Sequence, residues 1–535
     1  MKTRLIWMGS ALAATSFALA VAPAAEVQLP KKHLSAVGVD AQAMSAPGIS
    51  SERPATGGAP ITISVVEGAR QTFAGLGAST GNWGSEYQSL TPARRAQLSR
   101  MFWRDLNFKI FRLWLNVDEY SPTRGAHDLT RFRTQYVRSG AIADAKANGV
   151  TTLVLAPDHI PPYMRSSDKV DGPINDAEME NFVTLIAEAI RQLKAEDGIT
   201  IQATGIENEP DMTPDQIVRG VKRLRAELDA RGLQAVKIIA SEASSVDGRF
   251  YSQLDALQAD PAAWNALDGI SSHSYNMAAT DKAAGYIAGT NGRNTKAYWM
   301  TEASDNGPEE EGMTGVPAIR AASLAARFLN DMNHRVTHWI HFLGLESTRA
   351  PYTDDATRII AFEANPFRLK VMKKYHTYQQ LSQAFEVGAV FRDSQSSLDG
   401  DMTWTFGQKP HLFAATAQNP DGSWSSGICN FTADSFLQVQ GWADDKWNIE
   451  QGGHTPAQAF PVTLQIAELK NRAAVPFVVH RTNATLTNTR VETVIMKNGT
   501  VTIRVAPLEL VTLRSTPSKK PAVSRSSKIK KATPR

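Results

Sequence analysis

The sequence predicts an α/β fold, a (β/α)8 TIM barrel followed by a C-terminal antiparallel β-sandwich side domain. Between residues 61 and 384, short apolar runs alternate with amphipathic helical patterns, which is typical of strands in a parallel sheet. Eight such units in about 320 residues match the size of a barrel. From residue 385 to residue 514 the pattern changes to short strands separated by turn signals, which favours a sandwich.

The eight apolar runs are expected to form the barrel strands. Each run is followed by polar or glycine-containing residues and then by a helical pattern. In chain order the runs are FAGLGA (73–78), KIFRLWL (109–115), TTLVLA (151–156), IQATGI (201–206), VKIIAS (236–241), LDGISS (267–272), KAYWMT (296–301) and VTHWIHF (336–342).

Three segments between these runs have the pattern of helices with one buried face. Apolar residues recur at i, i+3, i+4 and i+7 in residues 92–106 and 177–196, which is the helical period. Residues 213–232 begin with Thr213 and end with Gly232. These residue types are favoured at the N-cap and just beyond the last turn of a helix.

The side domain is expected to contain six short strands, with turns at NPDG (419–422) and KNG (497–499). The run ITISVV (61–66) precedes the barrel, and its assignment to the barrel or to the side domain stays open. The six runs are MTWTFG (402–407), HLFAATAQ (411–418), SSGICNFT (425–432), FVVHRTN (477–483), ETVIMKNG (492–499) and TVTIRVAP (500–507).

Both ends of the chain are expected to lie outside the two folded domains. Residues 1–25 combine a basic start, an apolar run and A-x-A patterns, as a secretory signal peptide does. The apolar run is short for a membrane anchor, and no later run is long enough to span a membrane, so we expect a secreted or periplasmic protein. Residues 26–60 have the composition of a linker, and residues 515–535 that of a basic, disordered tail.

The net charge of +4 comes from these ends. Nine of the 57 Lys and Arg residues lie in residues 1–25 and 515–535, which contain no acidic residue. The body therefore has 48 basic and 53 acidic residues, a balance of about −5. Since a body that binds nucleic acid would be basic, no nucleic-acid partner is expected. Cys429 is the only cysteine, which excludes an intrachain disulfide, and the oligomeric state stays open.

The segment GIENEPDM (205–212) places two carboxylates at the end of the fourth apolar run. Alternation along a strand puts Glu207 and Glu209 on one face, and Pro210 marks the end of the strand because it cannot donate to a ladder. The chemistry of a barrel takes place where its strands end and the following loops begin. We therefore expect Glu209 at the barrel rim.

A second carboxylate, Glu302, ends the seventh run in KAYWMTEAS (296–304) and occupies an equivalent place. Two carboxylates at one barrel mouth meet the needs of glycoside hydrolysis. One protonates the leaving oxygen, and the other attacks the anomeric carbon or activates a water molecule.

Over about residues 61–514 the chain resembles glycoside hydrolase clan A, and most of all glycoside hydrolase family 30. The motifs are QTFAGLGAS in the first strand, PPYMRSS after the third, ENEP at the fourth, SSHSYN at the sixth and WMTEAS at the seventh. Each motif is weak alone, and their order and spacing make the resemblance specific. The family has a barrel joined to a side β-sandwich, and the resemblance implies a retaining mechanism.

The resemblance also assigns roles to residues that match the family's motifs. Glu209 matches the acid/base of the Asn-Glu-Pro motif, and Glu302 matches the nucleophile. Asn208 would bind the sugar 2-hydroxyl. Arg112, in KIFRLWL, matches the arginine beneath the nucleophile, where a cation keeps a carboxylate ionised.

Two residues of the SSHSYN motif would belong to the same wall of the site. Tyr275 would orient Glu302, and His273 would line the wall beside it. Family members also have an aromatic residue at the end of the eighth strand, as the floor under the sugar. Trp339, His341 and Phe342 are open for that place, and Trp339 is taken as a substrate-binding candidate.

Further aromatic residues follow strands one to three and could stack on sugar rings. Trp83 is taken as the substrate-binding candidate among them. The set is Trp83, Tyr87, Trp114, Tyr120 and Tyr163.

Other polar residues have less specific readings. Glu207 is expected to support the site rather than act as the acid, and Glu242, in IIASEAS, has no preferred role. The run HRVTHWIH (334–341) suggests a metal site, but His338 and His341 fall on opposite faces of a strand and cannot share an ion. No metal and no cofactor are expected.

The sequence thus predicts an exported retaining β-glycosidase that acts through a glycosyl-enzyme on Glu302. Plant or microbial β-glycans and shorter β-glycosides are the candidate substrates, and the glycan and linkage stay open. One alternative is a non-catalytic carbohydrate-binding protein on an inactive barrel. The other is a different clan A glycosidase, such as a xylosidase.

Overall fold

A computed structural model describes residues 56–81, 84–167, 172–275, 277–288, 296–304, 316–348, 357–398, 412–433 and 457–517. These residues belong to one compact unit, Ser51–Arg535. The expectations for residues 1–25 and for most of 26–60 and 515–535 lie outside the described residues.

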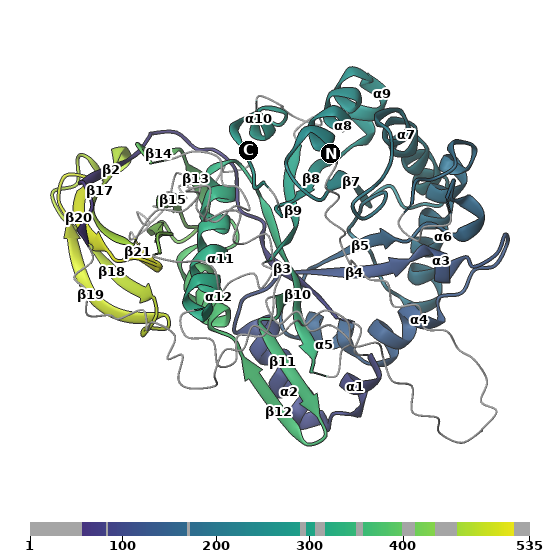
Figure 1. The fold of residues 1–535 in the computed structure, drawn as a ribbon, viewed down its shortest axis with the longest axis horizontal. Coiled ribbons are helices and arrows are strands. Elements are labelled where there is room, and N and C mark those ends of the chain that lie inside the picture. The colour runs from purple at the N-terminus through teal and green to yellow at the C-terminus, as the bar shows by residue number, and fades with distance from the viewer. Residues whose placement is uncertain are drawn as a thin grey trace, which may run out of the picture. The chain divides into compact units, whose positions relative to one another are not determined.

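Eight parallel strands in the described part of the chain form a closed barrel (Figure 1). The barrel closes because β10 pairs with both β3 and β9. Every apolar run that was expected to be a barrel strand overlaps one of these strands, so the predicted fold class is confirmed. The strands are β3 (Gly75–Thr80), β4 (Ile110–Asn116), β5 (Thr152–Asp158), β6 (Ala203–Thr204), β7 (Lys237–Ala243), β8 (Gly269–His273), β9 (Ala297–Ala303) and β10 (His338–Ser347).

Helices surround the barrel (Figure 1). Among the described residues, none of them is both long and apolar enough to cross a membrane. They are α1 (Gly84–Ser89), α2 (Pro92–Ser99), α3 (Val117–Tyr120), α4 (Thr130–Phe132), α5 (Ala141–Ala147), α6 (Met179–Asp197), α7 (Pro214–Ala230), α8 (Gly248–Ala259), α9 (Pro261–Ala266), α10 (Asp281–Gly285), α11 (Val316–Asn333) and α12 (Lys373–Ala384).

The cap residues read from the sequence begin and end α7 as expected. The Thr213 side chain accepts from the Gln216 backbone N–H, and the Gln216 side chain accepts from that of Thr213. This reciprocal pair satisfies two backbone donors at the helix start. Gly232 follows the last turn with φ of +71°, a conformation that glycine adopts without a steric penalty.

Strand alternation separates the two faces of the barrel wall. On β4, Phe111, Leu113 and Leu115 belong to the hydrophobic core shared with the helices, while Ile110 faces the barrel interior. Arg112, two residues further, therefore faces the interior as well. The floor of the interior is a small cluster formed by Ile110, Val154, Ala203, Ile239, Trp299 and Ile340.

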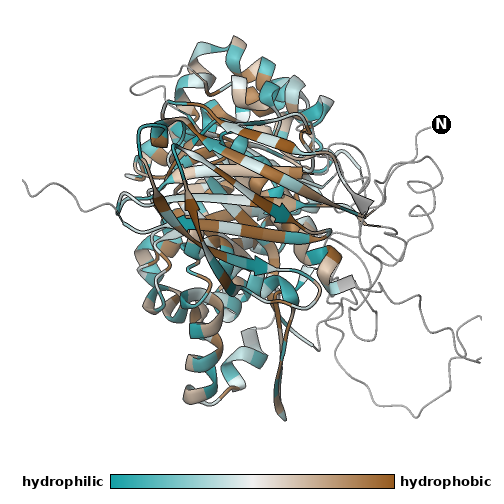
Figure 2. Ribbon diagram, turned by 90° about the vertical axis from the view of Figure 1, so that its left-hand side faces the viewer, coloured by the Kyte–Doolittle hydropathy of each residue, from teal (hydrophilic) through white to brown (hydrophobic). Residues whose placement is uncertain are grey.

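The side domain consists of two sheets with a buried core of their own. Along its strands, hydrophobic and hydrophilic residues alternate (Figure 2). The six-stranded sheet is antiparallel, in the order β13 (Val390–Arg392), β15 (Leu412–Gln418), β16 (Trp424–Asn430), β21 (Glu509–Ser515), β18 (Val475–Thr482) and β19 (Thr489–Met496). The other sheet contains β1 (Thr56–Gly57), β17 (Gln458–Ile466), β2 (Ile61–Val65), β14 (Ser394–Ser396) and β20 (Thr500–Val505).

The second sheet contains strands from both sides of the barrel in the sequence. β2 precedes the barrel in sequence and pairs with β17 and β14 of the side domain. The expected turn at 497–499 joins β19 to β20, which lie in different sheets. Strands β17 and β21 had no counterpart in the sequence reading, and the expected strand 402–407 lies outside the described residues. A hairpin of β11 (Ile360–Ala364) and β12 (Phe367–Val371) extends the barrel sheet from β10.

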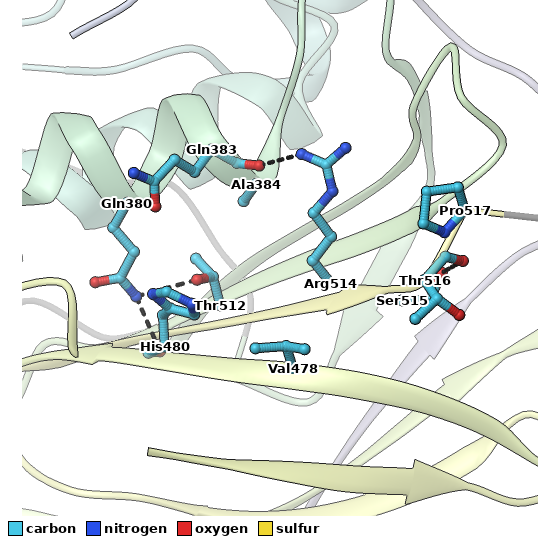
Figure 3. A pocket seen from close by; sticks show the side chains of 10 residues that line it. All are labelled: Gln380, Gln383, Ala384, Val478, His480, Thr512, Arg514, Ser515, Thr516 and Pro517. Carbon is cyan, nitrogen blue, oxygen red and sulfur yellow. Dashed lines mark hydrogen bonds between the residues drawn. The ribbon is translucent and has the colours of Figure 1, made fainter. Parts of the chain in front are cut away.

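Polar side chains of α12 join the barrel to the side domain at a small pocket (Figure 3). Gln380 donates to the His480 carbonyl at 3.0 Å and to the Thr512 hydroxyl at 3.2 Å. Arg514 donates to the Gln383 carbonyl at 2.5 Å. These bonds satisfy polar groups where two separate cores meet, so the pocket belongs to the joint between the domains.

Candidate active site

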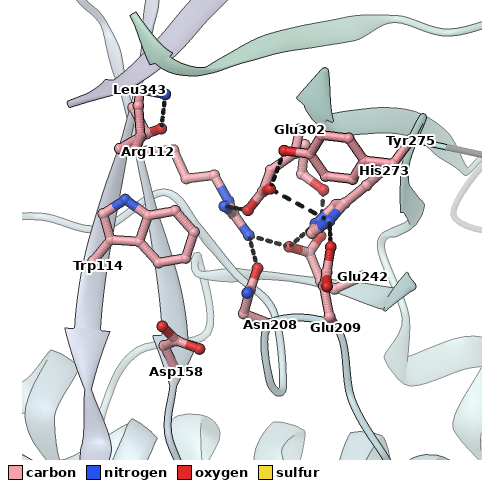
Figure 4. Close-up of polar contacts among 12 residues, drawn as sticks. Arg112, Trp114, Asp158, Asn208, Glu209, Glu242, His273, Tyr275, Glu302 and Leu343 are labelled. Atoms are coloured by element: carbon pink, nitrogen blue, oxygen red, sulfur yellow. Dashed lines mark hydrogen bonds and ion pairs between the residues drawn. The ribbon is translucent and has the colours of Figure 1, made fainter. Parts of the chain in front are cut away.

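The predicted site residues from β4, β6, β8 and β9 meet at one end of the barrel (Figure 4). Arg112 lies in β4, Glu209 follows β6, and His273 and Glu302 lie in β8 and β9. Parallel strands bring their carboxyl ends to the same mouth of a barrel. This explains how residues far apart in sequence assemble here.

Arg112 is the central cation of the site, and its side chain is fully buried. It donates to Glu302 at 2.5 Å, to Glu242 at 2.9 Å and to Asn208 at 3.0 Å. Its guanidinium also lies over the Trp114 ring, 4.4 Å from the centroid. Burial alone would lower the pKa of Arg112, but the charges of the two carboxylates outweigh it and raise the pKa. A buried cation that is paired with two carboxylates can be retained in the interior.

Glu302, on β9, is held by groups from β4 and from β8 with its following loop. One carboxylate oxygen accepts from Arg112, and the other accepts from the Tyr275 hydroxyl at 2.8 Å. His273 Nδ1 lies 3.6 Å from that second oxygen. Burial, followed by the carboxylate charges, raises the pKa of Tyr275 well above its usual 10, so the phenol keeps its proton and can donate. The predicted neighbours of Glu302 are therefore the observed ones.

Glu209 occupies a different setting at the open side of the cluster. About 17% of its side-chain surface is exposed, and one carboxylate oxygen lies 2.9 Å from His273 Nδ1. Burial raises the pKa of Glu209 and outweighs the opposing effect of His273, while the charge of Glu302 raises it further. A carboxyl group with a raised pKa is suited to donate a proton near neutral pH.

His273 contacts all three carboxylates of the cluster. Beyond Glu209 and Glu302, its Nε2 atom lies 3.9 Å from Glu242. Burial by itself would lower the pKa of His273, but the charge of Glu302 and the contacts with Glu209 and Glu242 raise it to about 9. The imidazole is therefore a cation at neutral pH and forms a wall of the site together with Tyr275.

Glu242 is the carboxylate that the sequence reading left without a role. It accepts from Arg112 and, at 2.9 Å, from the Thr301 hydroxyl. Burial would raise its pKa, but His273 and Arg112 lower it to about 2, so it is an anion. Its place at the end of the fifth apolar run, equivalent to those of Glu209 and Glu302, was the signal that could have identified it.

The backbone is strained where several strands reach the mouth. Four non-glycine residues there have φ near +50° to +62°, a region that costs about 1–3 kcal/mol. Strain of this kind collects at functional sites because the surrounding structure must enforce it. The four residues are His159, Glu209, Glu242 and Leu343.

The assignment of Trp339 to the sugar floor is wrong. Its side chain is fully buried, its indole donates to Asp331 at 2.7 Å, and its ring packs against Phe328. His341 shares this outer face of β10 and lies 2.7 Å from the Tyr378 hydroxyl. Alternation along the strand sends both side chains toward the helices.

Phe342 takes an inward position in the middle of β10. Its ring makes an edge contact with Trp114 at 5.9 Å. In Figure 4, Trp114 and Asp158, which ends β5, lie on the Arg112 side of the cluster, away from His273 and Tyr275. Among the other aromatic candidates, Tyr87 and Tyr120 are each 1% exposed and cannot stack on a sugar. Trp83 lies outside the described residues.

Glu209, His273 and Glu302 also satisfy the geometry of a metal site. One ligand atom from each lies within 4.8 Å of the others. A histidine must be neutral to bind a metal, however, and His273 has a pKa of about 9. The three groups therefore form an ion-pair network more readily than a metal centre. The two histidines of the other metal reading, His338 and His341, lie on opposite faces of β10, because His338 stacks on Trp299 inside the barrel.

The same 4.8 Å limit bounds the separation of the two predicted catalytic carboxylates. Retaining glycosidases place their carboxyl groups about 5–5.5 Å apart, and inverting ones about 6.5–9.5 Å apart, to leave room for a water molecule. One oxygen of Glu209 and one of Glu302 thus approach within 4.8 Å, which favours the closer, retaining arrangement.

No family model matches the sequence, and no curated protein matches it either. Solved structures do match. SrfJ from Salmonella typhimurium is 15% identical, with a TM-score of 0.60, and the match covers 85% of this chain and 92% of that one. An endo-β1,6-glucanase is 16% identical, with a TM-score of 0.60 and coverage of 85% and 94%.

The catalytic domain of the glycoside hydrolase family 30 xylanase C from Talaromyces cellulolyticus is 15% identical, with a TM-score of 0.58 and coverage of 85% and 100%. At such identities the similarity shows a shared fold. The resemblance to clan A glycoside hydrolases, stated from short motifs, is therefore confirmed at the level of the fold.

Proposed function

We propose that this chain is a retaining β-glycosidase that hydrolyses O-glycosidic bonds through a glycosyl-enzyme on Glu302. The proposal rests on one observation: an oxygen of Glu209 and an oxygen of Glu302 lie within 4.8 Å of each other, and the two carboxyl groups have different surroundings. Glu209 has a raised pKa, whereas Glu302 is ion-paired with Arg112. Two adjacent carboxyl groups whose environments differ in this way can act as acid and nucleophile.

The first step would use both groups at once. Glu302 attacks the anomeric carbon, and the proton of Glu209 passes to the departing oxygen, so the glycosidic bond breaks as the ester bond forms. Tyr275 donates to the oxygen of Glu302 that Arg112 does not hold. This contact fixes the orientation of the carboxylate before the attack.

The second step depends on the loss of the Glu302 charge. Since that charge raises the pKa of Glu209, forming the ester lowers it, and Glu209 becomes a base. It then takes a proton from water while the water oxygen attacks the anomeric carbon and releases Glu302.

The substrate we propose is a β-linked glycan or a shorter β-glycoside. The names of the structural relatives include xylanases and a β1,6-glucanase, which supports β-glycans as a class. We also propose that the protein is exported, because residues 1–25 have the pattern of a signal peptide.

Product release from a panel of aryl β-glycosides and β-linked polysaccharides tests the proposal, with Glu302→Ala as the matched inactive variant. We expect at least one substrate to be cleaved by the wild type alone, with the first-formed product anomer retained in a proton NMR time course. Binding of a glycan without cleavage would favour the carbohydrate-binding alternative. Cleavage that survives in Glu302→Ala would show that the nucleophile is another residue.

A further inference from the structure

Within the ion-paired cluster around Arg112 and His273, the two cations are matched by two carboxylates only if Glu242 is counted. The cations are Arg112 and His273, and the anions paired with them are Glu242 and Glu302. Burial raises the pKa of Glu209, which favours its protonated form more than in an exposed carboxyl group. Removing the Glu242 charge would leave one buried cation without a matching anion.

A bulge in strand β7 sets the position of Glu242. The register between β7 and β8 shifts by one residue at Glu242, and the register between β8 and β9 shifts by one at Thr301. Such bulges re-aim side chains next to active sites. Glu242 is the extra residue of β7, and Thr301 is the extra residue of β9. The Thr301 hydroxyl donates a hydrogen bond to the Glu242 carboxylate at 2.9 Å, so the two bulges are joined.

A glycine leaves room for the carboxylate. A Cβ atom at Gly205 would lie 2.9 Å from Cγ of Glu242, closer than real Cβ contacts. Gly205 directly follows the short strand β6, just ahead of Asn208 and Glu209. The loop that carries the acid can therefore lie directly against Glu242.

We propose that Glu242 is a positioning residue that keeps the barrel mouth electrically balanced. Its carboxylate offsets one of the two buried cations, so Glu209 stays protonated as the acid and Arg112 stays shared between two carboxylates. This role rests on the proposed glycosidase function and adds a third carboxylate to it. Glu242 acts through Arg112 and His273 and does not itself touch the reacting atoms.

The titratable groups around this network come from six barrel strands, β4 to β9, or from the loops that follow them. They are Arg112 from β4, Asp158 from β5, Glu207 and Glu209 after β6, Glu242 from β7, His273 and Tyr275 from β8 with its following loop, and Glu302 from β9. With Glu242 neutral, the surroundings of Glu209 become more positive, which favours its carboxylate form. When Glu242 is neutral, the His273 imidazolium also loses an anionic neighbour. The pKa of His273 should therefore fall, as that of Glu209 does.

The pH dependence of kcat/KM for Glu242→Gln tests the proposal. The basic limb of that profile reports the acid of the free enzyme. We expect the limb to move down by about one pH unit, the size of shift that a nearby charge produces. Glu242→Asp, which keeps the charge, should hold the limb near that of the wild type. An unmoved limb in Glu242→Gln would overturn the proposal.

Glu346→Gln is a matched control for the loss of a buried anion. Glu346 is fully buried and pairs with Arg358 at 2.8 Å on β10. Its variant should lose stability as Glu242→Gln does and keep the basic limb in place. An equal shift of the limb in this control would show that instability, rather than charge balance, moves it, and would also overturn the proposal.

A measurement on the wild type separates this proposal from the glycosidase function. In 15N NMR of histidine-labelled protein, with the signal assigned by its loss in His273→Gln, the His273 imidazole should titrate well above its usual 6.5. A wild type that cleaves no substrate would refute the glycosidase function while leaving this titration to decide the charge balance. If the His273 imidazole titrated at or below pH 6.5, the proposed charge balance would be overturned, whatever the results with the Glu242 variants.

Discussion

Two layers of the barrel interior lie on the same strands and differ in kind. The floor is apolar and includes Ile110 and Trp299. Two or three residues further along those strands, Arg112 and Glu302 form buried ion pairs. Two or three residues along a strand therefore separate the apolar layer from the charged layer.

The comparison shows how one fold combines stability with chemistry. The floor gains free energy by removing apolar surface from water. The charged layer loses hydration and keeps its stability only while each ion has its partners. Substitutions in the floor should therefore cost stability, and substitutions in the charged layer should cost both stability and activity.

The largest effect is expected for Arg112→Met. Two buried carboxylates would lose their cation, so the free energy of unfolding should fall by about 3–5 kcal/mol. Loss of preorganised charge should lower kcat/KM by a further factor of about 10²–10³. Chemical denaturation and kinetics check these values, with Arg358→Met as the control that should lose stability alone. Wild-type stability in Arg112→Met would contradict the description of the charged layer.

Trp299→Ala tests the floor. Truncating a fully buried tryptophan should lower the free energy of unfolding by about 3–5 kcal/mol through lost burial and the cavity left behind. The kcat/KM of the protein that remains folded should change far less than in Arg112→Met. The two layers would not be separable if Trp299→Ala kept its stability and lost its activity.

The pH dependence of stability tests the charged layer without a substrate. The folded-state pKa of His273 is raised to about 9, so its stabilising effect is complete below its unfolded value of about 6.5 and is lost as pH rises through 9. The expected loss over that window is about 3 kcal/mol. Denaturation curves between pH 6 and pH 10 measure it. His273→Gln should flatten the dependence, and an unchanged slope would assign it to another group.

The smallest effects distinguish the two faces of β10. Trp339→Phe removes the hydrogen bond to Asp331, which should cost about 1–3 kcal/mol of stability and leave KM unchanged. Phe342→Leu should raise KM by a few-fold, since an aromatic contact contributes about 0.5–1.5 kcal/mol. Steady-state kinetics and denaturation on both variants give the comparison. A raised KM in Trp339→Phe together with an unchanged KM in Phe342→Leu would indicate that Trp339 contacts the sugar.

Much of the candidate site could be predicted from short motifs. Glu209 and Glu302 were placed by their positions at strand ends, and Arg112 and His273 by the resemblance to glycoside hydrolase family 30. The structure brings all four into contact. The face of Trp339 was misjudged although strand alternation alone would have separated it from Phe342. That error came from residue type, because tryptophan is the residue expected beneath a sugar.

The sequence places Glu242 at the end of an apolar run as well, but it does not give the direction of its side chain. Its inward direction depends on a one-residue shift between β7 and β8, and no local pattern in IIASEAS distinguishes a bulged strand from a regular one. The same holds for Thr301 in β9. Bulges arise from the fit between neighbouring strands, which a single segment does not contain.

By itself, the sequence determined the order of the eight barrel strands, because apolar periodicity is a property of each segment. It also determined which carboxylates end the strands. Only the tertiary structure decided that Arg112 is shared between Glu242 and Glu302 and that His273 carries a charge. Burial and distance set these energies, and both depend on where distant parts of the chain meet.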